Sequence, residues 1–275
     1  MNSLQSTTTL HNGVKMPWFG LGVYKVPEGS EALESVKAAI KAGYRSIDTA
    51  ALYQNEEGVG QGIKESGVPR EELFITTKVW NSDQREDRVL EAFETSLQKL
   101  GLEYVDLYLI HWPVKEKYKQ SWKVLEKLYK EGRIRAIGVS NFQIHHLEDL
   151  MADAEIKPMV NQVELHPLFA QLELHEYCKK QEIQIEAWAP LGQGRLLDNP
   201  VLQDIASSHH KSIAQVILRW DIQNEIVTIP KSVRESRIIE NANIFDFTLS
   251  ESDMEKINAL NENKRFGGDP DNFNF

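Results

Sequence analysis

The sequence predicts a (β/α)8 barrel, an α/β fold also called a TIM barrel, and three observations lead to this class. The 275-residue chain contains eight short strand-like runs, and each is followed by helical sequence. Two runs, "VDLYLIHW" and "IRAIGVS", are almost continuously apolar, which is typical of parallel strands covered on both faces. Eight β/α units in roughly 250 residues match a closed barrel, whereas a doubly wound sheet is the structural alternative.

A hairpin is predicted before the first β/α unit. In "TTTLHNGVKMP", Asn12-Gly13 separates two β-prone runs, and both turn residues tolerate positive φ. We expect this short N-terminal hairpin to cap the bottom of the barrel.

The strands and helices follow from two different periodicities. Helices are predicted where apolar residues recur at i, i+3 and i+4, as in Ser30–Gly43, Arg85–Gly101, Ser121–Gly132 and Leu172–Glu182. The eight predicted strands are Phe19–Val23, Ser46–Thr49, Leu73–Val79, Val105–Trp112, Ile134–Ser140, Met159–Leu165, Ile183–Pro190 and Ile226–Pro230. No linker or low-complexity tract divides the chain, so residues 1–275 are expected to form a single domain.

Composition excludes several classes of function. The formal net charge is −10, and an acidic chain without a Lys/Arg stripe argues against nucleic-acid binding. Cys178 is the only cysteine, which rules out an intramolecular disulfide and favours a reducing compartment. The N-terminus lacks an apolar signal core, and no run approaches the roughly 18 apolar residues of a membrane span. We therefore expect a soluble cytoplasmic protein with no membrane partner.

Polar side chains at the strand ends are the candidates for chemistry, because active sites of such barrels gather there. Asp48 ends the second strand and Tyr53 follows it. Lys78 and His111 interrupt or end the next two apolar runs. A lysine in a covered strand must be paired or lose its charge, and Asp48 is the natural counter-ion. A purely structural ion pair is the alternative for any one of these residues.

Six motifs carry a resemblance to a known family. They are "GYRSIDTAALYQNEEGVG", "LFITTKVW", "DLYLIHWP", "GRIRAIGVSNF", "NQVELHP" and "IPKSVRESRIIENANIFDFTLS". In this order and over nearly the whole chain they resemble the aldo-keto reductases. The resemblance is strongest to the small bacterial members of the glyoxal/methylglyoxal and 2,5-diketogluconate reductase type. It implies a (β/α)8 barrel that binds NADPH without a Rossmann fingerprint.

The resemblance also implies a catalytic tetrad at Asp48, Tyr53, Lys78 and His111, with no departure from the family pattern. A free tyrosine has a pKa of about 10, and a nearby cation lowers that pKa. Lys78 is expected to supply this cation, so that Tyr53 can act as proton donor. Asp48 is expected to hold Lys78, and His111 to donate a hydrogen bond to the substrate carbonyl.

Further residues are implied as cofactor contacts. Trp188 stands where many members have a tyrosine that stacks on the nicotinamide, and an indole can stack as well. A Lys/Arg pair at a 2′-phosphate would favour NADPH over NADH. The implied carboxamide contacts are Ser140, Asn141 and Gln162; the phosphate contacts are Lys231, Ser232 and Arg237; Glu240 and Asn241 lie near the adenosine; and Leu191, Gly192 and Gln193 lie over the pyrophosphate.

The substrate pocket is predicted less directly. Tyr24, Trp80 and Trp112 follow strand ends and are expected to wall it together with His111; core packing is the alternative. The segment after the fourth strand and the tail "KRFGGDPDNFNF" are short. Short loops predict an open pocket for small aldehydes, α-dicarbonyls and keto-sugars.

Other features carry no functional prediction. Gly58, Gly60 and Gly62 lie inside a helical run, where helix packing or flexibility explains them better than phosphate binding. His145-His146 and His209-His210 are expected to point apart on helices, and no metal is predicted. Two other functions compete with this one: a non-catalytic NADPH-binding regulatory member of the family, and a hydrolase with two strand-end carboxylates. The family suggests a monomer.

Overall fold

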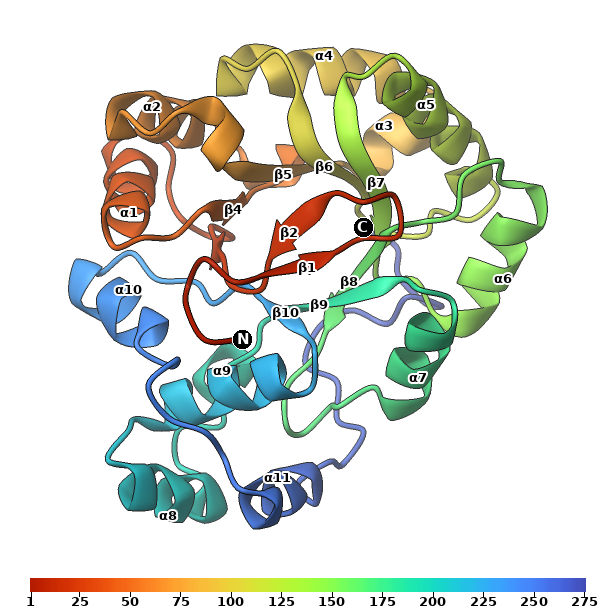
Figure 1. Cartoon of the computed structure of the whole chain (residues 1–275). Coiled ribbons are helices and arrows are strands. Elements are labelled where there is room, and N and C mark those ends of the chain that lie inside the picture. The colour runs from red at the N-terminus through yellow and green to blue at the C-terminus, as the bar shows by residue number, and fades with distance from the viewer.

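The computed structural model describes all residues, 1–275, and shows a ring of parallel strands surrounded by helices (Figure 1). The eight-stranded sheet has the order β10-β9-β8-β7-β6-β5-β4-β3. Parallel bridges join Phe19 to Thr228 and Gly22 to Lys231, so the first and last strands meet and the sheet closes. The predicted (β/α)8 barrel is confirmed, and the doubly wound alternative is wrong.

All eight predicted strands are present, although most are shorter than expected. Their bounds are β3 Leu21–Gly22, β4 Ser46–Asp48, β5 Phe74–Val79, β6 Val105–Ile110, β7 Ile134–Ser140, β8 Val160–Glu164, β9 Gln184–Trp188 and β10 Val227–Thr228. Strand β7 matches its prediction at both ends. The others lose residues where the chain leaves the ladder and turns toward a helix.

The outer layer consists of eleven helices (Figure 1). They are α1 Ser30–Lys41, α2 Glu56–Ser66, α3 Asn81–Arg85, α4 Val89–Leu100, α5 Tyr118–Lys130, α6 Ile144–Asp153, α7 Leu172–Lys180, α8 Pro200–His209, α9 Ile213–Gln223, α10 Glu235–Ala242 and α11 Glu251–Asn258. Short 3-10 turns are η1 Ala51–Tyr53, η2 Arg70–Glu72 and η3 Gly192–Gly194. A continuous cluster of 63 buried apolar residues joins the strands to the helices. None of the helices has the length and apolar character needed to cross a membrane.

The N-terminal hairpin, β1 Thr7–Thr9 and β2 Lys15–Pro17, lies across one end of the barrel (Figure 1). Its Thr8 hydroxyl donates to Gln184 at the start of β9, and Asn12 donates to the carbonyl of Arg135 in β7. These contacts place it at the N-terminal ends of the strands, as predicted. The turn differs from the expectation: only Gly13 has positive φ (87°), and the loop is the longer kind in which one glycine completes the turn.

The three glycines of α2 serve helix packing. A Cβ on Gly58 would lie 2.8 Å from Ala32 Cβ in α1, and one on Gly62 would lie 2.8 Å from the Leu33 carbonyl oxygen. At Gly60 it would lie only 2.2 Å from the carbonyl oxygen of Leu100 in α4. The prediction that these glycines serve helix packing is confirmed.

Candidate active site

The four predicted tetrad residues come from four consecutive parts of the barrel. Asp48 ends β4, Tyr53 ends the 3-10 turn η1, Lys78 lies in β5, and His111 directly follows β6. Lys78 Nζ donates to Asp48 Oδ1 at 2.6 Å, to the Thr49 carbonyl at 2.9 Å and to the Tyr53 hydroxyl at 3.4 Å. The Tyr53 and His111 ring centroids are 5.8 Å apart. The structure therefore brings all four together at the C-terminal ends of the strands.

The Lys78–Asp48 pair is fully enclosed, with side chains 0% and 2% exposed. Burial would lower the pKa of Lys78, but Asp48 and Tyr53 raise it above its ordinary value. Burial raises the pKa of Asp48, whereas the ammonium 2.6 Å away and the Gln162 amide favour its carboxylate form. The result is a paired cation beside the Tyr53 hydroxyl, as the sequence predicts.

The pKa of Tyr53 differs from the sequence expectation. Burial raises this pKa to about 12, and Lys78 opposes the increase without reversing it. The expected net lowering of the Tyr53 pKa is thus wrong for the protein alone. Burial destabilises the phenolate by more than one ammonium at 3.4 Å stabilises it. Tyr53 holds its proton at neutral pH, which is the state a proton donor needs.

His111 is buried and neutral. Burial, followed by the charge of Lys78, holds the pKa of His111 well below its usual range. Its Nδ1 atom has no hydrogen-bond partner in the protein. A neutral imidazole still has one N–H to donate, so this side chain keeps the capacity predicted for it.

The predicted carboxamide contacts form a network among themselves. The Ser140 hydroxyl donates to the backbone carbonyl of Gln162 at 2.8 Å, and the Asn141 side-chain amide donates to the backbone carbonyl of His111 at 3.0 Å. Trp188 Nε1 donates to Asn141 Oδ1 at 2.8 Å, which fixes one edge of a half-buried indole. Gln162 donates its amide nitrogen to Asp48 and Glu186, so its Oε1 is the atom left for a ligand.

The predicted phosphate contacts lie around the start of α10. Lys231 and Arg237 are exposed, and neither forms an ion pair with an acid, whereas Lys41 and Lys180 do. Ser232 is buried, and its hydroxyl oxygen accepts a hydrogen bond from the backbone N–H of Arg234. In helix α10, Glu240 is exposed and Asn241 is buried. Unpaired cations at a helix start fit a phosphate. Leu191 and Gln193, with Gly192, lie at the turn η3 after β9.

The predicted pocket walls lie beside the tetrad. The Tyr24 ring is 5.1 Å from the Tyr53 ring, and the Trp80 ring is 5.0 Å from the His111 ring. Trp112 is buried and contacts Phe273 and Phe275, with centroids 5.2 and 5.0 Å away. Tyr24, Trp80 and Trp112 thus share the aromatic region in front of the tetrad.

The tail after α11 folds back over this aromatic region, which the sequence did not predict. The Phe275 ring stacks on Trp80 at 6.0 Å, and its main-chain oxygen accepts from Arg85 at 2.8 Å and Asn81 at 3.2 Å. Glu164 accepts the backbone N–H groups of Phe266 and Gly267 at 2.7 and 2.8 Å. A short tail therefore does not leave the pocket open on this side, because aromatic rings at its end cover it.

The two pairs of adjacent histidines have different contacts. His145 and His146 were expected to point apart, but both Nε2 atoms approach Asp271 in the tail, at 2.8 and 3.4 Å. These three residues could meet one metal ion. However, His146 Nδ1 accepts the Gln143 N–H, which leaves its proton on Nε2 and makes it a donor to Asp271 rather than a metal ligand. His209 contacts Asp253 at 2.9 Å. The absence of a metal stays a prediction.

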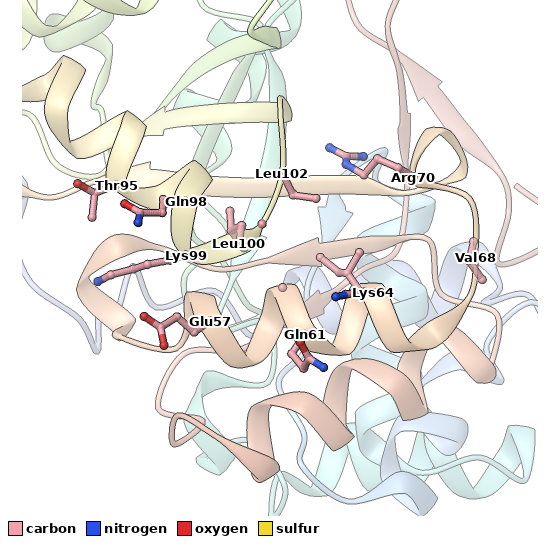
Figure 2. A pocket seen from close by; sticks show the side chains of 13 residues that line it. Glu57, Gln61, Lys64, Val68, Arg70, Thr95, Gln98, Lys99, Leu100 and Leu102 are labelled. Carbon is pink, nitrogen blue, oxygen red and sulfur yellow. The ribbon is translucent and has the colours of Figure 1, made fainter.

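Two other features lie away from the tetrad. Cys178 is buried, and burial raises the pKa of its thiol to about 12, which is typical of an inert cysteine. A surface depression of about 800 Å³ lies between α2 and α4 on the outside of the barrel (Figure 2). Its lining includes Gln61, Lys64 and Lys99, and contains no predicted site residue.

Sequence and structure comparisons identify the family. The sequence profile of the Aldo/keto reductase family matches residues 19–262. The chain belongs to the aldo/keto reductase family. Glyoxal reductase of Bacillus subtilis (strain 168) is 70% identical over 99% of both chains, and methylglyoxal reductase DkgA of Escherichia coli (strain K12) is 47% identical over 96% of both.

Solved structures of other aldo/keto reductases have the same fold. MGS-M4, an aldo-keto reductase enzyme from a deep-sea metagenome library of the Medee basin, is 48% identical and superposes with a TM-score of 0.95, covering 98% of this chain and 100% of that one. A mutant of Gox0644 in complex with NADPH is 44% identical, with a TM-score of 0.94 over 98% and 99% of the two chains. This aldo/keto reductase is therefore an oxidoreductase with the barrel that its sequence predicts.

Proposed function

We propose that this aldo/keto reductase uses NADPH to reduce small aldehydes and α-dicarbonyls such as methylglyoxal and glyoxal, with keto-sugars as further substrates. The observation that carries the proposal is the tetrad geometry. A phenol that is protonated at neutral pH lies 3.4 Å from a buried ammonium, beside a neutral imidazole. The reductase relatives at 70% and 47% identity support the choice of small dicarbonyls.

The unpaired cations support NADPH as the cofactor. Lys231 and Arg237 are two exposed positive charges without acidic partners near the α10 start, and Ser232 adds a hydroxyl. Gln162 Oε1 offers an amide acceptor, and the half-buried Trp188 offers a stacking surface. Leu191, Gln193, Glu240 and Asn241 are proposed to contact the rest of the dinucleotide. When bound, NADPH supplies the hydride that reduces the carbonyl carbon.

The protein's own residues handle the proton and the substrate oxygen. The neutral His111 donates a hydrogen bond to the carbonyl oxygen and orients it toward the Tyr53 hydroxyl. Tyr53 gives its proton to this oxygen as negative charge develops there. The Lys78 ammonium stabilises the phenolate that remains, and Asp48 keeps this ammonium in place at 2.6 Å. Solvent then returns a proton to Tyr53.

The Tyr53→Phe substitution tests the proton-donor assignment. The variant keeps the ring that packs between Tyr24 and His111 but lacks the hydroxyl. We expect kcat for methylglyoxal, followed by loss of NADPH absorbance, to fall roughly 10²- to 10⁴-fold, the usual contribution of a general acid. NADPH binding, measured by quenching of tryptophan fluorescence, should persist.

Two outcomes would contradict this proposal. A Tyr53→Phe variant with most of the wild-type rate would show that another group donates the proton. A wild-type protein that binds NADPH but reduces neither methylglyoxal, glyoxal nor an aromatic aldehyde would instead favour the regulatory, non-catalytic alternative.

We further propose that residues 1–275 act as one monomeric, cytoplasmic domain without nucleic-acid partners. The single, buried cysteine suits a reducing compartment, and the net charge of −10 disfavours polyanions. Size-exclusion chromatography with light scattering tests the monomer; a stable dimer would contradict it.

A further inference from the structure

A chain of buried polar groups crosses the barrel interior beneath the Tyr53 hydroxyl. Lys78 in β5 donates to Asp48 Oδ1 in β4 at 2.6 Å. Gln162 in β8 donates to Asp48 Oδ2 at 2.7 Å and to Glu186 Oε2 in β9 at 2.8 Å. None of the four is more than 1% exposed. The catalytic lysine is thus linked to a second carboxyl group, Glu186, that no step of the proposed mechanism uses.

The two carboxyl groups fix the orientation of the Gln162 amide. Asp48 and Glu186 each present an acceptor oxygen to the same end of the amide, so that end must be the NH₂ group, and both its hydrogens are used. Rotation of the amide would break both hydrogen bonds inside the barrel. Glu186 therefore helps to hold Gln162, and Gln162 holds the oxygen of Asp48 that Lys78 does not bind.

Charge balance distinguishes the two acids. Lys78 is the only cation of the cluster and it pairs with Asp48. Glu186 has no cationic partner, and its Oε1 has no hydrogen-bond partner, which disfavours an ionised carboxylate. Burial first, and then the charge of Asp48, raise the pKa of Glu186 to about 8. Below this pH the cluster contains one ammonium, one carboxylate and one neutral acid, and its net charge is zero.

No other charged side chain of the neighbouring elements pairs with Glu186. Strand β8 also carries Glu164, but its oxygens accept from His166 and the tail backbone. Strand β10, Val227–Thr228, carries no charged residue. Helix α7 covers β9 from outside the ring (Figure 1), where its Lys179 pairs with Glu225. Asp48 and Lys78, with Tyr53 and His111 beyond them, are the titratable groups that share the interior with Glu186.

We propose that Glu186 is a positioning residue of the reductase site: it holds Asp48 on Lys78 through Gln162 and, as a neutral acid, keeps the cluster free of a second negative charge. This inference rests on the proposed function. Ionisation of Glu186 adds a negative charge to the enclosure in which the Tyr53 phenolate must form. An anion there disfavours the phenolate, so reduction slows as Glu186 loses its proton.

A pH profile with a matched control tests the proposal. We would measure kcat for methylglyoxal at saturating NADPH from about pH 6 to 9.5 for the wild type, Glu186→Gln and Asp221→Asn. Asp221 is also fully buried, accepts one hydrogen bond from a barrel residue (Thr228) and has an unpartnered second oxygen, but it makes no contact with the tetrad. The wild type and Asp221→Asn should lose roughly threefold to tenfold in kcat with a midpoint of about 8, whereas Glu186→Gln should not.

An infrared titration provides a readout that is independent of turnover. In Asp221→Asn, a protonated-carboxyl band should disappear with a midpoint of about 8, and this band should be missing from the Asp221→Asn, Glu186→Gln double variant. The spectrum needs neither cofactor nor substrate. It therefore decides whether Glu186 holds a proton in the folded protein even if Glu186→Gln fails to fold.

The outcomes separate this inference from the proposed function. An inactive wild type sinks the proposed function. An active wild type whose alkaline limb is unchanged in Glu186→Gln, or an Asp221→Asn protein without a carboxyl band that titrates near pH 8, overturns the role of Glu186. The role of Glu186 is supported if the alkaline fall in kcat disappears only in Glu186→Gln while KM for methylglyoxal is unchanged.

Discussion

At the scale of single residues, the environment decides which group reacts. Asp48 and Tyr53 are five positions apart and both are acids, yet they are suited to different tasks. Asp48 accepts from Lys78 and Gln162, which favour its carboxylate. Tyr53 is a phenol whose pKa burial raises to about 12, so it stays protonated until charge develops on a substrate oxygen. The ammonium of Lys78 connects the two.

Loss of the Lys78 charge should therefore affect stability as well as catalysis. In Lys78→Met, Asp48 is left in the barrel interior with only the Gln162 amide as partner. Breaking a buried ion pair on one side costs about 3–5 kcal/mol, and urea unfolding at pH 8 should show a loss of this size. Replacing both partners, in the double variant with Asp48→Asn, should recover most of it.

The pH dependence of the Lys78→Met variant gives a check on its cause. Without the ammonium, burial holds the folded-state pKa of Asp48 above its unfolded value, so the folded state binds more protons between the two values. Stability should then fall as pH rises through this window, and the deficit at pH 5 should be smaller than at pH 8. Lys180→Met is the control, because its pair with Glu176 is about 70% exposed on both sides. An equal change in both variants would contradict the argument.

At the scale of elements, the tail is the part of the site that local patterns do not predict. Lys78 and His111 were recognisable because each is a polar residue in or after an apolar strand. Phe275 has no such signal, since its partner Arg85 lies 190 positions away in the chain and nothing in "NFNF" specifies that contact. Glu186 had a local signal, a charge inside an apolar strand, but its partner Gln162 came from the tertiary structure.

The Phe275→Ala substitution tests whether the tail limits substrate size. The ring contacts both Trp80 and Trp112, so its removal opens space beside these two side chains, and Trp80 in turn contacts His111. We expect kcat/KM for a bulky aromatic aldehyde to rise roughly tenfold relative to methylglyoxal, the discrimination that small volume changes produce in apolar pockets. Phe169→Ala, at a ring that contacts His166 instead, is the control. An unchanged ratio of the two kcat/KM values would show that Phe275 does not shape the pocket.

At the scale of the whole molecule, the barrel was predictable because each β/α unit repeats one local pattern. Eight runs of β-branched and apolar residues gave eight strands, and parallel neighbours along the chain gave their order. Strand lengths were less predictable, since residues such as Trp112 and Leu165 are as apolar as those in the strands but lie beyond the strand ends. The hydrogen bond from Gln162 to Asp48 joins residues 114 positions apart and depends on barrel closure.

Cofactor binding should stabilise this closed barrel as a unit, because the proposed NADPH contacts come from β7, β8, β9 and α10. A ligand at 100 times its Kd adds about 2.7 kcal/mol, and each kcal/mol raises Tm by roughly 2–4 °C in chains of about 150–250 residues. NADPH should thus raise Tm by several degrees, more than NADH at the same concentration, and Arg237→Ala should remove most of this difference. Arg88→Ala, at an exposed pair with Glu86, should retain it. Equal Tm shifts with NADH and NADPH in the wild type would contradict the assignment of Lys231 and Arg237 to the 2′-phosphate.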